Sequence, residues 1–425
     1  MNPVLEKRLA IFALLVFTGV LSIASYYNGS DSGESSVSSP FDKIFSVVRY
    51  LTYGATICLL LARLKTVIRP ALRDPFMWGL MIIVVSSFMW SDFPDISQKQ
   101  GRLMLLTTLF GLYLASRFSV KELVRIFAVA VGIAAVFSLL YSLAFRGAAV
   151  ETGFNAGCWR GPFLQKNIFA RFLVAYGLPI LLVALGSRKH RFIWWTVFGI
   201  AVLLIQLTNS KSALLIILTL TALVPLYKAL RSTGSILVPF LITIILIGGS
   251  VLTFLVENWE PFLFKLGKDP SLTGRTYIWE ASINLISQRP WLGYGFQAFF
   301  ADGGAGEKAV WDYLRIRVSQ AHNGFINVAA ELGLLGLMFF VLSMVSTYIR
   351  GITWVRFTKD PEDLWPLLYV TYFFMYNITE STNLEVNSLL WIFYSAAAFS
   401  ARTMRPREPS LFTQYPEQES LAETT

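Results

Sequence analysis

Apolar segments of about twenty residues recur along the whole chain and are separated by shorter polar connections. An α-helix of about twenty apolar residues is long enough to cross the hydrocarbon core of a lipid bilayer. We predict about twelve such helices, which begin near residues 9, 44, 76, 101, 123, 167, 192, 213, 236, 325, 366 and 386. The pattern therefore predicts an all-α, polytopic membrane protein.

The composition agrees with lipid as the main solvent. Of the 425 residues, 55% are hydrophobic and 15% are charged, whereas about a quarter of a soluble domain is charged. The net charge of +10 is spread in small clusters between apolar segments and forms no basic stripe, which argues against nucleic acid as a partner. Two histidines and two cysteines offer no familiar metal-ligand spacing, so we predict neither a metal nor another cofactor.

The distribution of Lys and Arg predicts the orientation in the membrane, because short connections rich in these residues stay in the cytoplasm. Such residues occur in alternate connections: Arg63, Lys65, Arg69 and Arg73; Arg117 and Lys121; Arg188, Lys189 and Arg191; Lys228 and Arg231; Arg350, Arg356 and Lys359; Arg402, Arg405 and Arg407. We interpret residues 9–24 as a retained first helix, since no small-residue cleavage site follows. Both termini are then predicted to be cytoplasmic, in a cell inner membrane, and any active site in the external loops would face the periplasm.

The same assignment divides the chain into two parts. Residues 1–401 form the predicted transmembrane domain, with a large external loop at about 257–323 before the tenth helix. Residues 402–425 form a short tail that contains Pro and Glu, and we predict that it is disordered in the cytoplasm.

Arg160 and Lys166 lie in an external connection, where the positive-inside tendency disfavours them. They flank a Gly-Pro turn, and Lys166 begins a predicted helix whose free amide groups can bind an anion. We predict that the pair binds phosphate. The alternative is that both are interfacial residues whose charged ends reach lipid headgroups.

Arg275 lies in the large external loop, at the entrance of a helix predicted to end before Pro290. One face of that helix is marked by Ile278, Ala281, Ser282, Leu285 and Ile286. A cation at a helix N-terminus is unfavourable, so Arg275 is better explained as a ligand for an external anion than as a solvated arginine.

His322 is the only histidine predicted outside, and an imidazole can accept a proton from a hydroxyl near neutral pH. Asn323, Asn327 and Glu331 follow at every fourth position and form a polar stripe on an apolar span. They either support the site and its acceptor or make structural hydrogen bonds between helices. With arginines for phosphate nearby, His322 is the predicted catalytic residue of a transfer reaction.

Two further features carry weaker predictions. The glycine-punctuated turn at residues 291–295 would let the backbone approach a ligand or another helix closely. Glu380 and Glu385, near the outer end of the eleventh span, could shape an acceptor pocket, although carboxylates are common in exposed loops.

The chain resembles the O-antigen ligase and O-antigen polymerase superfamily. The motifs that carry the likeness are Gly274-Arg275 with Trp279, the turn Pro290 to Gly295, His322-Asn323, and Glu331-Leu332-Gly333 with Gly336; it extends to Trp90-Ser91, Pro94, Ser97 and Gly161 through Asn167. It thus covers most of the membrane domain. One departure is Gln165, which stands where many relatives have histidine.

The resemblance implies a membrane glycosyltransferase that moves a glycan from undecaprenyl diphosphate to an acceptor hydroxyl, without a nucleotide sugar or metal. Arg160, Arg275 and Lys166 would hold the diphosphate, and His322 would act as general base or orient the acceptor. The partners implied are the undecaprenyl-diphosphate-linked glycan and other polysaccharide assembly and export proteins.

Three functions are weighed. The general likeness to exopolysaccharide polymerases favours polymerisation of exopolysaccharide or O-antigen repeat units. An O-antigen ligase that transfers the glycan to lipid A-core is the first alternative. A multispan transporter of lipid-linked sugars is the second, but the large loop has no counterpart in the first half of the chain, as two symmetric halves would require.

Overall fold

The computed structural model describes residues 3–21, 40–72, 74–231, 275–315, 317–381 and 383–403. In chain order its α-helices are α1 (Pro3–Phe17), α2 (Pro40–Ala62), α3 (Leu64–Leu72), α4 (Pro75–Ser86), α5 (Pro94–Arg117), α6 (Val120–Ala144), α7 (Arg146–Ala149), α8 (Lys166–Gly186), α9 (Arg191–Leu207), α10 (Lys211–Ala229), α13 (Arg275–Gln288), α14 (Ala305–Leu314), α15 (Gly324–Val355), α16 (Trp365–Thr379) and α17 (Leu389–Thr403). Short 3-10 turns are η1 (Ser87–Met89), η2 (Gly153–Asn155) and η4 (Pro361–Leu364). Within these ranges there is no β-strand, only an isolated bridge between Val150 and Trp159.

The helices confirm an all-helical membrane protein. Five of them, α2, α6, α8, α10 and α15, contain segments long and apolar enough to cross a membrane, whereas the apolar helices α9 and α17 are shorter. The chain is therefore a multipass membrane protein. The span predicted to begin near residue 236 lies outside the described residues, as do residues 257–274 of the predicted loop. The total of about twelve crossings stays a prediction.

Local chemistry explains where two helices begin. Helix α5 starts at Pro94 rather than near residue 101, because proline is favoured in the first turn and Asp95 complements the positive end of the helix dipole. Helix α6 starts after a reciprocal capping box, in which Ser119 and Glu122 bond each other's backbone amides.

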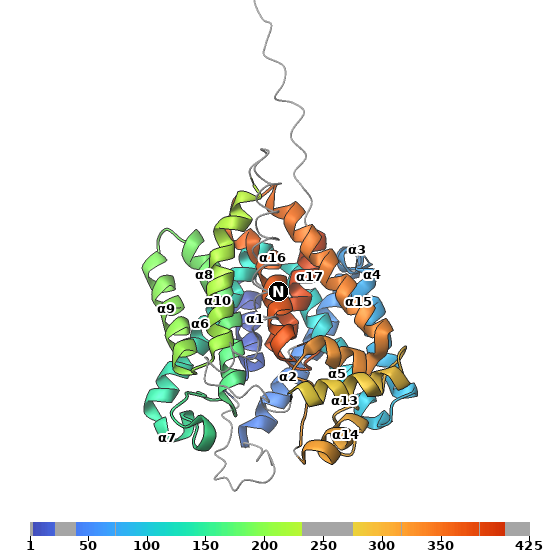
Figure 1. Cartoon of the computed structure of the whole chain (residues 1–425). Helices are drawn as coiled ribbons and strands as arrows, with labels where there is room; N and C mark the ends of the chain where they lie inside the picture. Colours follow the sequence, from blue (N-terminus) through green and yellow to red (C-terminus); the bar gives the residue numbers. More distant parts are fainter. Residues whose placement is uncertain are drawn as a thin grey trace, which may run out of the picture.

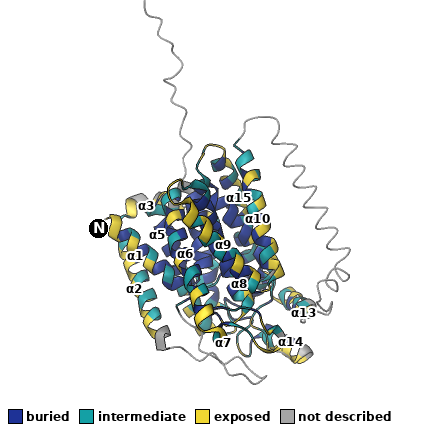
Figure 2. Ribbon diagram, turned by 90° about the vertical axis from the view of Figure 1, so that its left-hand side faces the viewer, coloured by how far each residue is buried: buried dark blue, intermediate teal, exposed yellow. Residues whose placement is uncertain are grey.

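The core of the bundle lies where α5, α6, α8, α16 and α17 meet. Figure 2 shows buried residues through its middle, and Trp365 and Trp391 are fully buried there. Helix α17 approaches α5 so closely that a Cβ atom at Gly111 would lie 2.0 Å from the Ser395 hydroxyl. Small residues at such crossings are typical of membrane helices, since they let backbones come close.

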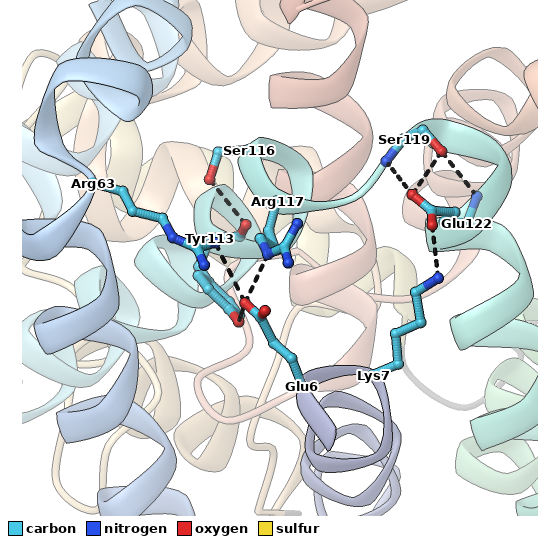
Figure 3. Close-up of polar contacts among 8 residues, drawn as sticks. All are labelled: Glu6, Lys7, Arg63, Tyr113, Ser116, Arg117, Ser119 and Glu122. Atoms are coloured by element: carbon cyan, nitrogen blue, oxygen red, sulfur yellow. Dashed lines mark hydrogen bonds and ion pairs between the residues drawn. The ribbon is translucent and has the colours of Figure 1, made fainter. Parts of the chain in front are cut away.

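Helices α7, α13 and α14 all lie at the same end of the bundle, as Figures 1 and 2 both show, with α7 on the opposite side from α13 and α14 in Figure 1. The buried carboxylate of Glu6 joins α1 to α5 (Figure 3). It accepts hydrogen bonds from Tyr113 at 2.7 Å and from Arg117 at 2.8 Å, and Arg63 is 3.4 Å away. The pairing offsets the cost of burying the Glu6 charge and fixes the first helix against the bundle.

Helix α15 is broken at Gly333, whose backbone has a φ of 67°. At the break the amides of Leu334 and Leu335 donate to the carbonyls of Pro290 and Trp291, at 2.7 and 3.3 Å. In return, the amides of Tyr294 and Gly295 donate to the carbonyls of residues 330 and 331, at 3.0 and 2.8 Å. The turn at residues 290–295 thus replaces the hydrogen bonds that the broken helix loses.

The connection between α4 and α5, together with the first turn of α5, makes hydrogen bonds and an ion pair with the same segment. The Trp90 indole donates to the carbonyl of Leu292 at 2.9 Å, and the Ser97 hydroxyl donates to the carbonyl of Phe296 at 2.8 Å. Arg289, just before the turn, forms an ion pair with Asp92 at 2.6 Å. The motif residues around 90–97 and 290–295, far apart in the sequence, therefore form one structural unit. The close approach of the turn to another helix is confirmed.

We predict that Gly333→Ala destabilises the protein. The new Cβ atom would lie 2.2 Å from the Trp291 carbonyl group, and the left-handed backbone alone costs a non-glycine residue about 1–3 kcal/mol. The melting temperature in detergent should fall relative to wild type. Gly199→Ala is the matched control, because a Cβ atom at Gly199 of α9 meets nothing within 4 Å. Equal melting temperatures for the two variants would contradict the role assigned to the break.

Candidate functional site

The carboxylate of Glu380 lies between two of the predicted site residues. One oxygen is 2.8 Å from a terminal nitrogen of Arg275, and the other is 2.9 Å from Nδ1 of His322. Glu380 directly follows α16, Arg275 begins α13, and His322 lies just before α15. The structure therefore brings Arg275 and His322 together through a residue to which the sequence assigned only a weak role.

The backbone around His322 is held in place from two sides. His322 has a φ of 51°, in the left-handed region, and the indole of Trp279 donates to the carbonyl of Ala321 at 2.8 Å. The amide of Ala321 donates to the side chain of Asn327 at 3.2 Å. The side chain of Asn323 then caps α15 by accepting from the amides of residues 325 and 326. These contacts join Trp279 of α13 to the His322-Asn323 pair before α15.

The ionisation of Glu380 determines which nitrogen of His322 carries a proton. Burial by itself raises the pKa of Glu380, but the hydrogen bond from His322 and the charge of Arg275 outweigh it and hold the pKa below the usual range. Glu380 is then a carboxylate at neutral pH and can only accept hydrogen bonds. In the neutral imidazole the proton is therefore on Nδ1, and Nε2 is the acceptor.

Of the predicted phosphate ligands, Arg160 lies in the connection before α8 and Lys166 is the first residue of α8. Arg160 donates to the carbonyls of Ala148 and Leu164 at 2.9 and 3.2 Å, and the Lys166 ammonium is 3.6 Å from the sulfur of Cys158. Figure 1 places this connection, next to α7, at the same end of the bundle as α13 and α14. The side chains of both residues thus contact residues that are nearby in the sequence. Their binding of phosphate stays a prediction.

The polar stripe at the start of α15 is present. The Asn327 amide donates to the Glu331 carboxylate at 2.8 Å, and Asn323 donates to the carbonyl of Ile378 at 3.2 Å. Glu331 is buried and also bonds the backbone of Gln297. Of the two roles that the sequence allowed for the stripe, these contacts show the structural one, hydrogen bonds to other parts of the protein. A role in binding the acceptor stays a prediction.

Sequence reasoning missed Arg171 of α8. Its side chain is 12% exposed and lies 2.6 Å from the carboxylate of Glu385, five residues beyond Glu380. A charge within an apolar span indicates function by default, and this signal could have singled out Arg171. Among the described residues, no group of three or more His, Cys, Asp or Glu is placed to hold a metal ion.

Comparison with known proteins connects this site to polysaccharide assembly. The family described as O-antigen ligase matches residues 195–341, which include Arg275, Trp279, His322 and the break at Gly333. The chain is 26% identical over 332 residues to the "Exopolysaccharide production protein ExoQ" of Rhizobium meliloti (strain 1021), covering 75% of this chain and 74% of that protein. The chain is thus similar to the O-antigen ligase family over residues 195–341 and to an exopolysaccharide production protein over three quarters of its length.

A second relative is similar to this chain over a shorter stretch. It is the "Putative polysaccharide ligase" of Rickettsia prowazekii (strain Madrid E), 35% identical over 121 residues, or 26% of this chain and 29% of that protein. The resemblance expected from the sequence motifs is thus confirmed. Arg160, Arg171 and Glu380 lie outside the matched family region, so their place in the site rests on the structure and the sequence reasoning.

We predict that Glu380→Gln lowers glycan assembly about 10- to 100-fold, because a neutral amide no longer fixes the tautomer of His322 or pairs with Arg275. Membrane abundance should not change. Glu280→Gln, on the exposed face of α13, is the control and should behave as wild type. The measurement is the amount of glycan formed per unit of membrane protein. An unimpaired Glu380→Gln variant would remove Glu380 from the site.

Proposed function

We propose that the protein polymerises lipid-linked oligosaccharide repeat units in exopolysaccharide or O-antigen biosynthesis. The donor is a glycan on undecaprenyl diphosphate, and the acceptor is a hydroxyl of another lipid-linked repeat unit. The single observation that carries this proposal is the Glu380 carboxylate, which contacts Nδ1 of His322 and the guanidinium of Arg275 at once. His322, a proton acceptor, and Arg275, a cation that can pair with an anionic leaving group, thereby lie next to each other.

The arrangement supports a direct transfer. His322 Nε2 takes the proton of the acceptor hydroxyl while the acceptor oxygen forms a bond to the anomeric carbon of the donor glycan. The bond between that carbon and the phosphate oxygen breaks, and the electron pair leaves with undecaprenyl diphosphate. Glu380 stabilises the imidazolium that forms, and Arg275 balances the negative charge of the leaving diphosphate. Arg160 and Lys166 contribute further positive charge in this proposal.

The relatives support both a polymerase and a ligase. The larger match is to an exopolysaccharide production protein, which favours polymerisation. The second candidate function, ligation of a finished glycan to lipid A-core, has its own support in the ligase description of the matched family and of the Rickettsia relative. Both reactions use the same donor and the same three central residues.

The site belongs on the periplasmic side of the inner membrane in this proposal. The clusters of Lys and Arg in the sequence point to the cytoplasm at the other end of the bundle. Helices α13 and α14 and the connection around α7 then face the periplasm together, where lipid-linked glycans and other assembly and export proteins meet them.

We predict that His322→Ala and Arg275→Lys both abolish long glycan at matched membrane abundance. Loss of a general base typically costs about 100- to 10,000-fold, and a lysine cannot reproduce the two-pronged donation of arginine. The measurement is a gel profile of surface and secreted glycans from a strain that lacks the gene and carries wild type or a variant.

The pattern of glycans separates the candidate functions. Single repeat units in the deletion strain, with long polymer restored only by wild type, indicate a polymerase. Full-length lipid-linked polymer that is never transferred indicates a ligase. If His322→Ala restores long polymer as wild type does, the site assignment is wrong. If deletion of the gene leaves the glycan profile unchanged, a transporter is the better interpretation.

A further inference from the structure

We propose that Arg171 is a positioning residue for glycan transfer, which fixes Glu380 against His322 by holding the connection between α16 and α17. This inference rests on the proposed function, because it assigns Arg171 a part in the same reaction. Arg171 lies near the start of α8, within a segment apolar enough to span the membrane. An arginine that is only 12% exposed there requires a specific partner, and the structure supplies one.

The guanidinium of Arg171 contacts the α16–α17 connection at two points. One terminal nitrogen is 2.6 Å from the Glu385 carboxylate, and the other donates to the carbonyl of Ser381 at 3.4 Å. Ser381 directly follows Glu380 in the sequence. Arg171 therefore restrains the backbone next to Glu380, because it holds the carbonyl of Ser381 and the side chain of Glu385.

The described residues of the connection, 380–381 and 383–388, form neither a helix nor a strand, so contacts with other segments must hold it in place. Leu384 and Asn387 both adopt left-handed backbone conformations, with φ of 49° and 56°. Asn383 donates to the carbonyl of Gly324 at the start of α15 at 2.6 Å, and Asn387 accepts from Tyr53 of α2 at 2.7 Å. Arg171 adds the contact with α8, and it reaches the carbonyl of Ser381, the residue next to Glu380.

The geometry points to positioning rather than to diphosphate binding. Both terminal nitrogens of Arg171 are engaged with the protein, and its Nε is buried without a hydrogen-bond partner among the described residues. A donor without exposed surface cannot reach an external anion. By contrast, the Arg275 side chain is 33% exposed beside Glu380, so it is accessible to a ligand.

The test is a double-mutant cycle in proteoliposomes, with lipid-linked glycan extracted from the deletion strain as substrate. We expect Arg171→Lys, which keeps the charge and loses the planar fork, to lower kcat about 10-fold with KM for the glycan unchanged. In the Glu380→Gln background, Arg171→Lys should change kcat by less than about 2-fold, because the contact between the Glu380 carboxylate and His322 is already lost.

Two results would overturn the inference. They are a rise in KM without a fall in kcat, which indicates diphosphate binding, and effects of the two substitutions that multiply in the double variant. Arg125→Lys is the matched control, since Arg125 of α6 pairs with buried Glu362 at 3.2 Å, remote in the sequence from Glu380. It should keep wild-type kcat and KM.

A second variant covers the case in which Arg171→Lys is not recovered from membranes. Glu385→Gln removes the other half of the ion pair and should reproduce the loss of kcat and the absence of a further effect with Glu380→Gln. Wild-type kcat in Glu385→Gln would overturn the inference. Failure of the proposed function is recognised separately. In that case His322→Ala would keep the wild-type rate, independently of the result for Arg171→Lys.

Discussion

The structure of the site depends on one carboxylate, largely but not fully buried, that two groups share. Glu380 holds His322 with one oxygen and Arg275 with the other, so three separate segments of the chain meet at a single side chain. A carboxylate in this position cannot be left unpaired without a large loss of solvation free energy. The same requirement that stabilises the contact therefore orients the imidazole and keeps a guanidinium beside it.

The second constraint is that backbone groups in a membrane protein must be hydrogen-bonded within the protein. The break in α15 at Gly333 would leave amides and carbonyls unpaired, and the turn at residues 290–295 satisfies them. This exchange anchors the segment that joins α13 to α15, while Trp279 holds the backbone at Ala321. The site is thus built on a broken helix whose irregular backbone is supported by a loop.

The sequence predicted what depends on local pattern. The apolar segments gave most helices, Arg275 was placed at a helix entrance, and the stripe of Asn323, Asn327 and Glu331 was recognised from its spacing. Pairings over long distances in the sequence were beyond this reasoning. Glu380 is 58 residues from His322 and 105 residues from Arg275, and no local pattern relates them. The same holds for Arg171, whose contact with Ser381 spans 210 residues.

The most direct test of the central claim is to count both products of the transfer with purified protein in proteoliposomes and lipid-linked repeat units as the only substrate. The account predicts that wild type releases one undecaprenyl diphosphate for each glycosidic bond formed, and that His322→Ala loses both products together. Release of lipid diphosphate and glycan at the wild-type rate by His322→Ala would contradict it, as would glycan transfer without release of the lipid.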